Sequence, residues 1–192
     1  SLAPARVGRA ARGARLLGRR EQDDLALREA LDDLRVAVAR QADAHRPRDV
    51  VAAAAHVRAM RICRPGLREY HLEAEILHSF RSQGASGVAY NSIVAAGANA
   101  CVLHYAAGDT ELRDGELCLI DAGAEYGSYA SDITRTFPIG GRYTPAQREL
   151  YDLVVNAQQA AIDATRPGVR KIDSHWAAVR VLAQGMLDLR LL

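Results

Sequence analysis

The stretch from Leu117 to Pro138, LCLIDAGAEYGSYASDITRTFP, places two aspartates beside apolar runs that are typical of strands. Residues 117–120 are apolar, and residues 129–137 alternate in character and contain several β-formers. The pattern predicts two antiparallel strands joined by a glycine-containing connection. Asp121 and Asp132 would then share one face, about 5 Å apart if they lie directly across from each other. Carboxylates this close repel each other, so a metal ion between them is the economical explanation.

Composition bounds the class of protein. The chain has 192 residues, 49% of them hydrophobic, which is enough for one substantial core. The net charge of +2 is too small to argue for a nucleic-acid or membrane partner. The cysteines are odd in number and scattered, which disfavours a disulfide framework and favours a reducing, cytoplasmic compartment. No apolar run approaches the ~20 residues of a membrane-spanning helix.

Helical patterns flank a central group of short apolar runs. Residues 50–63 and 67–83 are predicted helices, the second with Tyr70, Leu77 and Phe80 near one face. The short runs that follow, from residue 90 to residue 105, are predicted strands. This order predicts an α+β fold in which helices cover one face of an antiparallel sheet.

Two further helices are predicted near the end of the sequence. Thr144-Pro-Ala-Gln147 has the form of a capping box with proline at the first helical position, and the helix should run to about residue 165. The last helix should begin near Ile172 and carry Trp176 on its apolar side. We expect the first of these helices to bury Leu150, Leu153, Val154, Ala157 and Ile162.

A series of short strings occurs in a fixed order: YNSIV at 90–94, GANA at 97–100, His104-Tyr105, DAG at 121–123 and DITRTFP at 132–138. Together they resemble the aminopeptidase P (Xaa-Pro aminopeptidase) branch of the pita-bread metallopeptidases. The resemblance is collinear over residues 49–192 and implies the N-terminal portion of a pita-bread catalytic domain. Residues 1–48 resemble the tail of the family's N-terminal domain and the linker after it.

The resemblance implies a two-metal site, usually with Mn²⁺, in which Asp121 chelates one ion and Asp132 bridges both. A hydroxide shared by the ions would cleave the bond between an N-terminal residue and a following proline. His104 matches the histidine that contacts the substrate and stabilises the tetrahedral intermediate. Taken without the resemblance, His104 beside Val102 and Leu103 is more typical of a core histidine. The implied partner is a peptide with proline at its second position.

One feature departs from the family pattern. The remaining ligands of the family, a histidine and two glutamates, come from strands after the helix that ends this sequence, and His175 stands in a different setting. We therefore expect only the first part of the pita-bread fold, half of the metal site and an uncovered apolar sheet face. Activity of the truncated chain alone and homo-oligomerisation stay open. The alternatives are a prolidase-type dipeptidase or a non-catalytic interaction module of the same ancestry.

Overall fold

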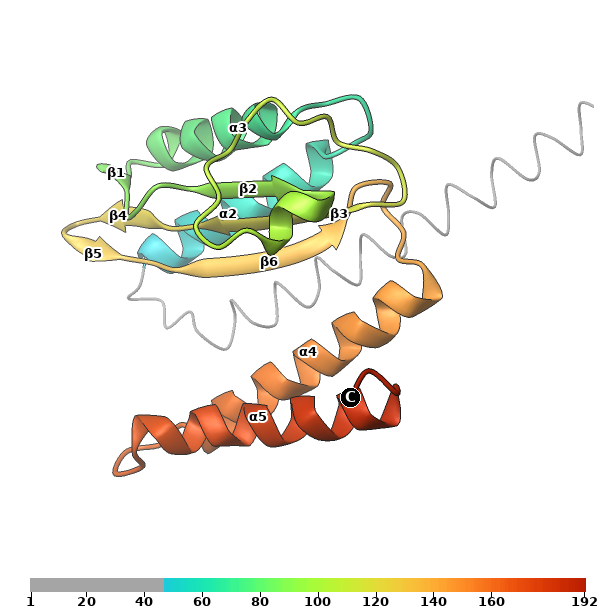
Figure 1. Cartoon of the computed structure of the whole chain (residues 1–192). Helices are drawn as coiled ribbons and strands as arrows, with labels where there is room; N and C mark the ends of the chain where they lie inside the picture. The colour runs from blue at the N-terminus through green and yellow to red at the C-terminus, as the bar shows by residue number, and fades with distance from the viewer. Residues whose placement is uncertain (1–46) are drawn as a thin grey trace, which may run out of the picture. The chain divides into compact units, whose positions relative to one another are not determined.

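The computed structural model describes residues 47–192, and the chain divides into two compact units between Arg142 and Tyr143. The predicted linker and domain tail at residues 1–48 therefore lie almost entirely outside the described residues. The described part of the first unit holds two helices and two small sheets, and the second unit is a pair of helices (Figure 1). Among residues 47–192, no helix combines the length and the apolar character needed to cross a membrane.

The first two predicted helices are confirmed as α2, Pro47–Ile62, and α3, Glu69–Ser82. Helix α3 buries Leu72, Ile76 and Phe80, which recur every four residues and so lie on one face. Tyr70 and Leu77 lie within about 80° of Phe80 around the helix axis, so the predicted shared face holds. Their side chains are nevertheless 43% and 39% exposed, because the row that α3 buries runs along the other side of Phe80, through Leu72 and Ile76.

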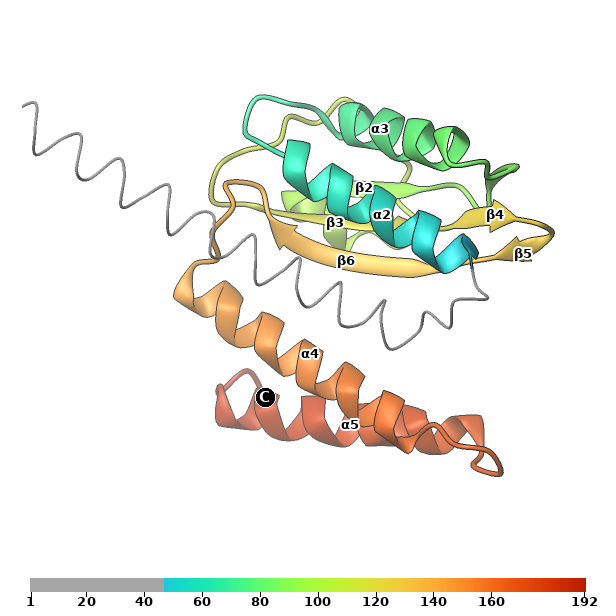
Figure 2. The same ribbon diagram turned by 180° about the vertical axis from the view of Figure 1, so that it is seen from behind.

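The main sheet confirms the antiparallel prediction. It consists of β2, Ile93–Ala96, β3, Leu117–Ala122, and β6, Ile133–Pro138, in the order β2-β3-β6. Along β3 every second residue is buried, namely Cys118, Ile120 and Ala122, and these join the core that α2 and α3 cover. The alternate residues, including Asp121, point to the opposite face. Figure 2 shows α2 in front of the strands, whereas Figure 1 shows the other face.

A second small sheet interrupts the connection that we predicted between the two aspartate-bearing strands. It consists of β1, Gly87–Val88, β4, Ala124–Tyr126, and β5, Tyr129–Ala130, in the order β1-β4-β5. Gly123 joins β3 to β4, and a Cβ there would lie 1.9 Å from the Ser131 carbonyl oxygen and 2.8 Å from the Tyr90 ring. Only glycine allows this close approach, which brings Tyr90 against the end of β3.

The predicted strands between residues 97 and 105 are wrong. Gly97–Cys101 forms a 3-10 helix, η1, and residues 102–104 form a bend and a turn. Val102 and Leu103 are 55% and 86% exposed, so their apolar side chains find no face to cover. The polar contacts of Asn99, described below, hold this segment instead of strand pairing. The segment lies on the side of the sheet opposite α2 (Figure 1).

The second unit contains α4, Pro145–Ala164, and α5, Lys171–Asp188. The predicted capping box is confirmed: Gln147 N donates to Thr144 Oγ1 at 3.3 Å, and Thr144 N donates to Gln147 Oε1 at 2.8 Å. The two helices pack on each other, and a Cβ at Gly185 would lie 2.2 Å from Leu153 Cδ1. The predicted burial is confirmed for Ala157 but is wrong for Leu150, Val154 and Ile162, which are 44%, 57% and 43% exposed.

Candidate functional site

Asp121 and Asp132 converge on one hydroxyl group. Tyr90 Oη lies 2.5 Å from Asp121 Oδ1 and 3.1 Å from Asp132 Oδ1. The residue opposite Asp121 in the β3–β6 register is Thr134, so Asp132, two residues earlier, reaches the same face from a diagonal position. The sequence prediction of a shared face therefore holds, whereas the directly opposed geometry does not.

Tyr90 acts as the donor between these carboxylates. Partial burial and the hydrogen bond to Asp121 raise the pKa of Tyr90 well above its ordinary value, so its hydroxyl stays protonated. A phenol has one proton, so the Tyr90 hydroxyl donates to one carboxylate at a time. Asp121 is the nearer acceptor, and Asp132 is also within hydrogen-bond distance. In the described structure this hydroxyl gives the two carboxylates a common partner. Sequence reasoning included Tyr90 only as the first letter of a string and assigned it no role.

A cavity of about 810 Å³ surrounds this cluster. Its size falls within the range of roughly 300–1,000 Å³ that is usual for small-ligand sites. Helix α3 and β1 supply walls through Glu73, Leu77 and Val88. Tyr90 and the two aspartates also line it, and the other lining residues are Asn91, Ser92, Ile93, His104, Tyr105, Ala106 and Ala107. The cavity lining thus combines apolar side chains with carboxylates, phenols and an imidazole.

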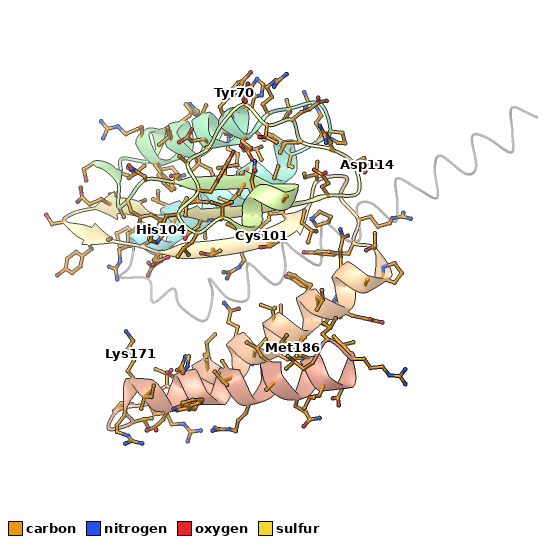
Figure 3. The ribbon with its side chains drawn as sticks, in the orientation of Figure 1. Tyr70, Cys101, His104, Asp114, Lys171 and Met186 are labelled. Carbon is orange, nitrogen blue, oxygen red and sulfur yellow. The ribbon has the colours of Figure 1, made fainter. Side chains whose placement is uncertain are left out.

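His104 reaches this cavity from a turn and not from a strand, which corrects the sequence prediction. Its backbone φ is 54°, in the left-handed region that non-glycine residues seldom adopt. Its side chain is exposed, so the reading as a core histidine fails. Figure 3 shows His104 and Cys101 on the side of the sheet that carries η1. The structure therefore brings all three predicted site residues to one cavity.

The two carboxylates in the cavity lining suit a hard divalent cation, because carboxylate oxygens are ligands that such ions prefer. Within residues 47–192, however, no group of three or more His, Cys, Asp or Glu side chains gathers at one point. Asp121 and Asp132 therefore fit as two ligands of a larger coordination set. Among the described residues no cysteine lines this cavity, and burial raises the pKa of Cys63 to about 12 and raises that of Cys118 as well, so these two thiols stay protonated.

Comparison with known proteins agrees with a metal-binding role for this site. The model of metallopeptidase family M24 matches residues 45–190. The chain belongs to metallopeptidase family M24. The Xaa-Pro aminopeptidase of Escherichia coli (strain K12) is 49% identical over 142 residues, which is 74% of this chain and 32% of that protein. The Xaa-Pro aminopeptidase of Haemophilus influenzae is 46% identical over 142 residues, covering 74% of this chain and 33% of the relative.

Solved structures of this M24 group share the fold. The aminopeptidase PepP of Pseudomonas aeruginosa superposes with a TM-score of 0.75 at 54% identity, over 77% of this chain and 33% of that chain. A zinc-substituted Escherichia coli aminopeptidase P in complex with product gives a TM-score of 0.72 at 48% identity, over 74% and 32% of the two chains. These likenesses confirm the resemblance and the α+β, partial pita-bread fold. The chain spans about a third of the length of the relatives it matches.

Proposed function

We propose that this M24 chain forms part of the catalytic domain of a metallo-aminopeptidase that cleaves the bond between an N-terminal residue and a following proline. The observation that carries the proposal is the convergence of Asp121 and Asp132 on Tyr90 in one cavity with His104. The names of the relatives, Xaa-Pro aminopeptidases, support the choice of substrate. The proposal assigns residues 49–192 to the catalytic domain and residues 1–48 to a linker and domain tail.

Each site residue has a distinct role in this proposal. Asp121 and Asp132 would hold divalent ions, and Mn²⁺ is our choice because both ligands are hard oxygen donors. When bound, such ions polarise a scissile carbonyl and lower the pKa of water. The His104 imidazole donates a hydrogen bond to the carbonyl oxygen as negative charge develops there. The Tyr90 hydroxyl orients Asp121, its nearer acceptor, and lies within hydrogen-bond distance of Asp132. We place the protein in the cytoplasm, in keeping with its three free thiols.

Manganese binding tests the proposal before any activity is assumed. We expect isothermal titration calorimetry to detect Mn²⁺ binding by the chain, weakened at least about tenfold in Asp121→Asn and in Asp132→Asn, because each change removes a charged ligand. Asp163→Asn is the matched control, since Asp163 lies on α4 and bonds Gln159 outside the cavity. Equal affinity in all four proteins would contradict the assignment of the ligands.

Peptide hydrolysis separates the alternatives. Release of the first residue from an Xaa-Pro tripeptide with Mn²⁺, lost in both aspartate variants, supports the aminopeptidase. Cleavage restricted to Xaa-Pro dipeptides identifies a prolidase-type enzyme instead. A stably folded chain that neither binds Mn²⁺ nor cleaves either peptide identifies a non-catalytic interaction module, for which the exposed apolar side chains of α4 and α5 provide a surface.

A further inference from the structure

Glu69, the first residue of α3, is a fully buried carboxylate that no cation pairs in the described structure. Its Oε1 accepts hydrogen bonds from Ala96 N at 2.8 Å and from Asn99 Nδ2 at 2.9 Å. Its Oε2 accepts from Tyr105 Oη at 2.9 Å and from Gly108 N at 3.0 Å. A buried carboxylate is costly unless its oxygens are satisfied, and here four donors satisfy them.

The four donors come from the two ends of one segment. Ala96 and Asn99 stand at its start, where β2 passes into η1, and Tyr105 and Gly108 stand at its end. His104 lies between these ends, in the turn with the left-handed backbone. Glu69 thus links the two ends of the segment through residues that lie 27 to 39 positions away in sequence. We call these four hydrogen bonds the Glu69 clasp, and the two ends that they join are the base of the segment.

Further contacts of the same kind reinforce the base of the segment. Asn99 Nδ2 also lies 2.9 Å from Tyr105 Oη and 3.0 Å from Thr110 Oγ1. The backbone of α3 continues the clasp, since Glu69 N donates to the Thr110 carbonyl at 3.1 Å and Tyr70 N to the Gly108 carbonyl at 3.3 Å. The middle of the segment, around Val102 and Leu103, is not held by packing, because these two side chains are 55% and 86% exposed. The position of His104 therefore depends on the polar base.

We propose that Glu69 is a positioning residue that acts through His104. It fixes the ends of the segment 97–108 and so holds the His104 imidazole over the cavity that Asp121 and Asp132 share. The inference deepens the proposed function and, in its catalytic part, rests on it. Its structural part, the clasp itself, is independent of any activity.

Hydrogen exchange of the 192-residue chain tests the clasp. In Glu69→Gln one side-chain oxygen becomes an NH2 group, which cannot accept the two hydrogen bonds that this oxygen receives. We therefore expect amide exchange in residues 97–108 to rise at least tenfold while β2 and β3 stay protected. Glu75→Gln is the matched control, because Glu75 lies on the same helix and pairs with Arg58 away from the segment. Exchange that is unchanged in Glu69→Gln, or that rises equally over β2, β3 and α2, would overturn the proposal.

A milder variant covers the case in which Glu69→Gln fails to fold. Tyr105→Phe removes one donor and leaves the other three contacts of Glu69 in place. We expect a two- to fivefold rise in exchange confined to residues 97–108. If that segment exchanges as in the parent chain, the clasp is overturned by this variant alone.

A double-mutant cycle tests whether Glu69 acts through His104. With an Xaa-Pro tripeptide and Mn²⁺, Glu69→Gln should lower kcat/KM at least tenfold in the parent chain and less than twofold in the His104→Ala background. A purely structural role would give the same fold-loss in both backgrounds, and that outcome overturns the positioning role. If the parent chain shows no activity by itself, the proposed function is decided by the Mn²⁺-binding test, because Asp121 and Asp132 are only two ligands of a larger coordination set. In that case the NMR resonances of the His104 ring test the positioning role. Glu69→Gln should shift them toward those of an unstructured histidine. Unchanged resonances would overturn the inference.

Discussion

Helices α3 and α4 both carry apolar side chains at helical spacing but differ in how deeply these side chains are buried. In α3, Leu72, Ile76 and Phe80 are almost completely excluded from solvent by α2 and the main sheet. In α4, Val154 and Ile162 are 57% and 43% exposed, and Ala157 is the one buried residue. Both sequences form helices, because the periodic pattern and the capping signals suffice for that. Burial, however, depends on whether another element covers the apolar stripe.

The largest predicted effect concerns matched isoleucines in these two helices. Ile76→Ala should lower the free energy of unfolding by about 2–5 kcal/mol, because it leaves a cavity in the core. Ile162→Ala should change it by less than about 0.5 kcal/mol, since the side chain is already partly in water. Urea unfolding followed by circular dichroism measures both. Equal losses would show that α4 is covered in solution by an element that the described structure does not place on it.

The sequence predicted helices and the antiparallel sheet well, because those depend on local patterns. Leu72, Ile76 and Phe80 recur with helical period, and Cys118, Ile120 and Ala122 recur with strand period. The segment 97–105 was mistaken for strands because its apolar letters resemble those of β2. Its conformation is set by Glu69, whose partners lie 27 to 39 residues away, and no local pattern encodes such contacts.

The candidate site shows the same division between local and distant information. Asp121 and Asp132 stood out because carboxylates beside apolar strand residues need a reason. Tyr90 did not, since a tyrosine before a strand is unremarkable until the structure places its hydroxyl between both carboxylates. Glu69 likewise reads as an ordinary acidic residue in a first helical turn. Both residues gain their roles from contacts that link segments far apart in sequence.

The second prediction concerns pH and the buried histidine of the first unit. His56 on α2 is fully buried, and burial lowers its pKa, as does the charge of Arg135, whereas its hydrogen bond to the Ala52 carbonyl and Asp121 act in the opposite direction. The unfolded chain therefore binds more protons below pH ~6.5, and the free energy of unfolding falls as the pH drops through that value. Urea unfolding at pH 7.5 and at pH 5.5 should show this loss.

Two variants isolate the contribution of His56. His56→Gln keeps a neutral donor for the Ala52 carbonyl and cannot take up a proton, so its stability should depend less steeply on pH between 7.5 and 5.5. His175→Gln, on the exposed surface of α5, removes a histidine from the second unit and should keep the slope of the parent chain. A parent-like slope in His56→Gln would assign the acid sensitivity to other groups.

The smallest predicted effect lies at the start of α4. Thr144→Ala removes the hydroxyl that accepts from Gln147 N and should cost about 1 kcal/mol of local helix stability. Thr165→Ala is the control, because the Thr165 hydroxyl only donates back to the Ala161 carbonyl at 2.8 Å, a bond that adds little to a helix. Since α4 buries so little, the loss should appear as faster amide exchange in residues 145–150, while α3 and β3 keep their protection. If Thr144→Ala instead lowers the protection of α3 to the same extent, the two units unfold together. Helices α3 and α4 would then differ in side-chain exposure but not in stability.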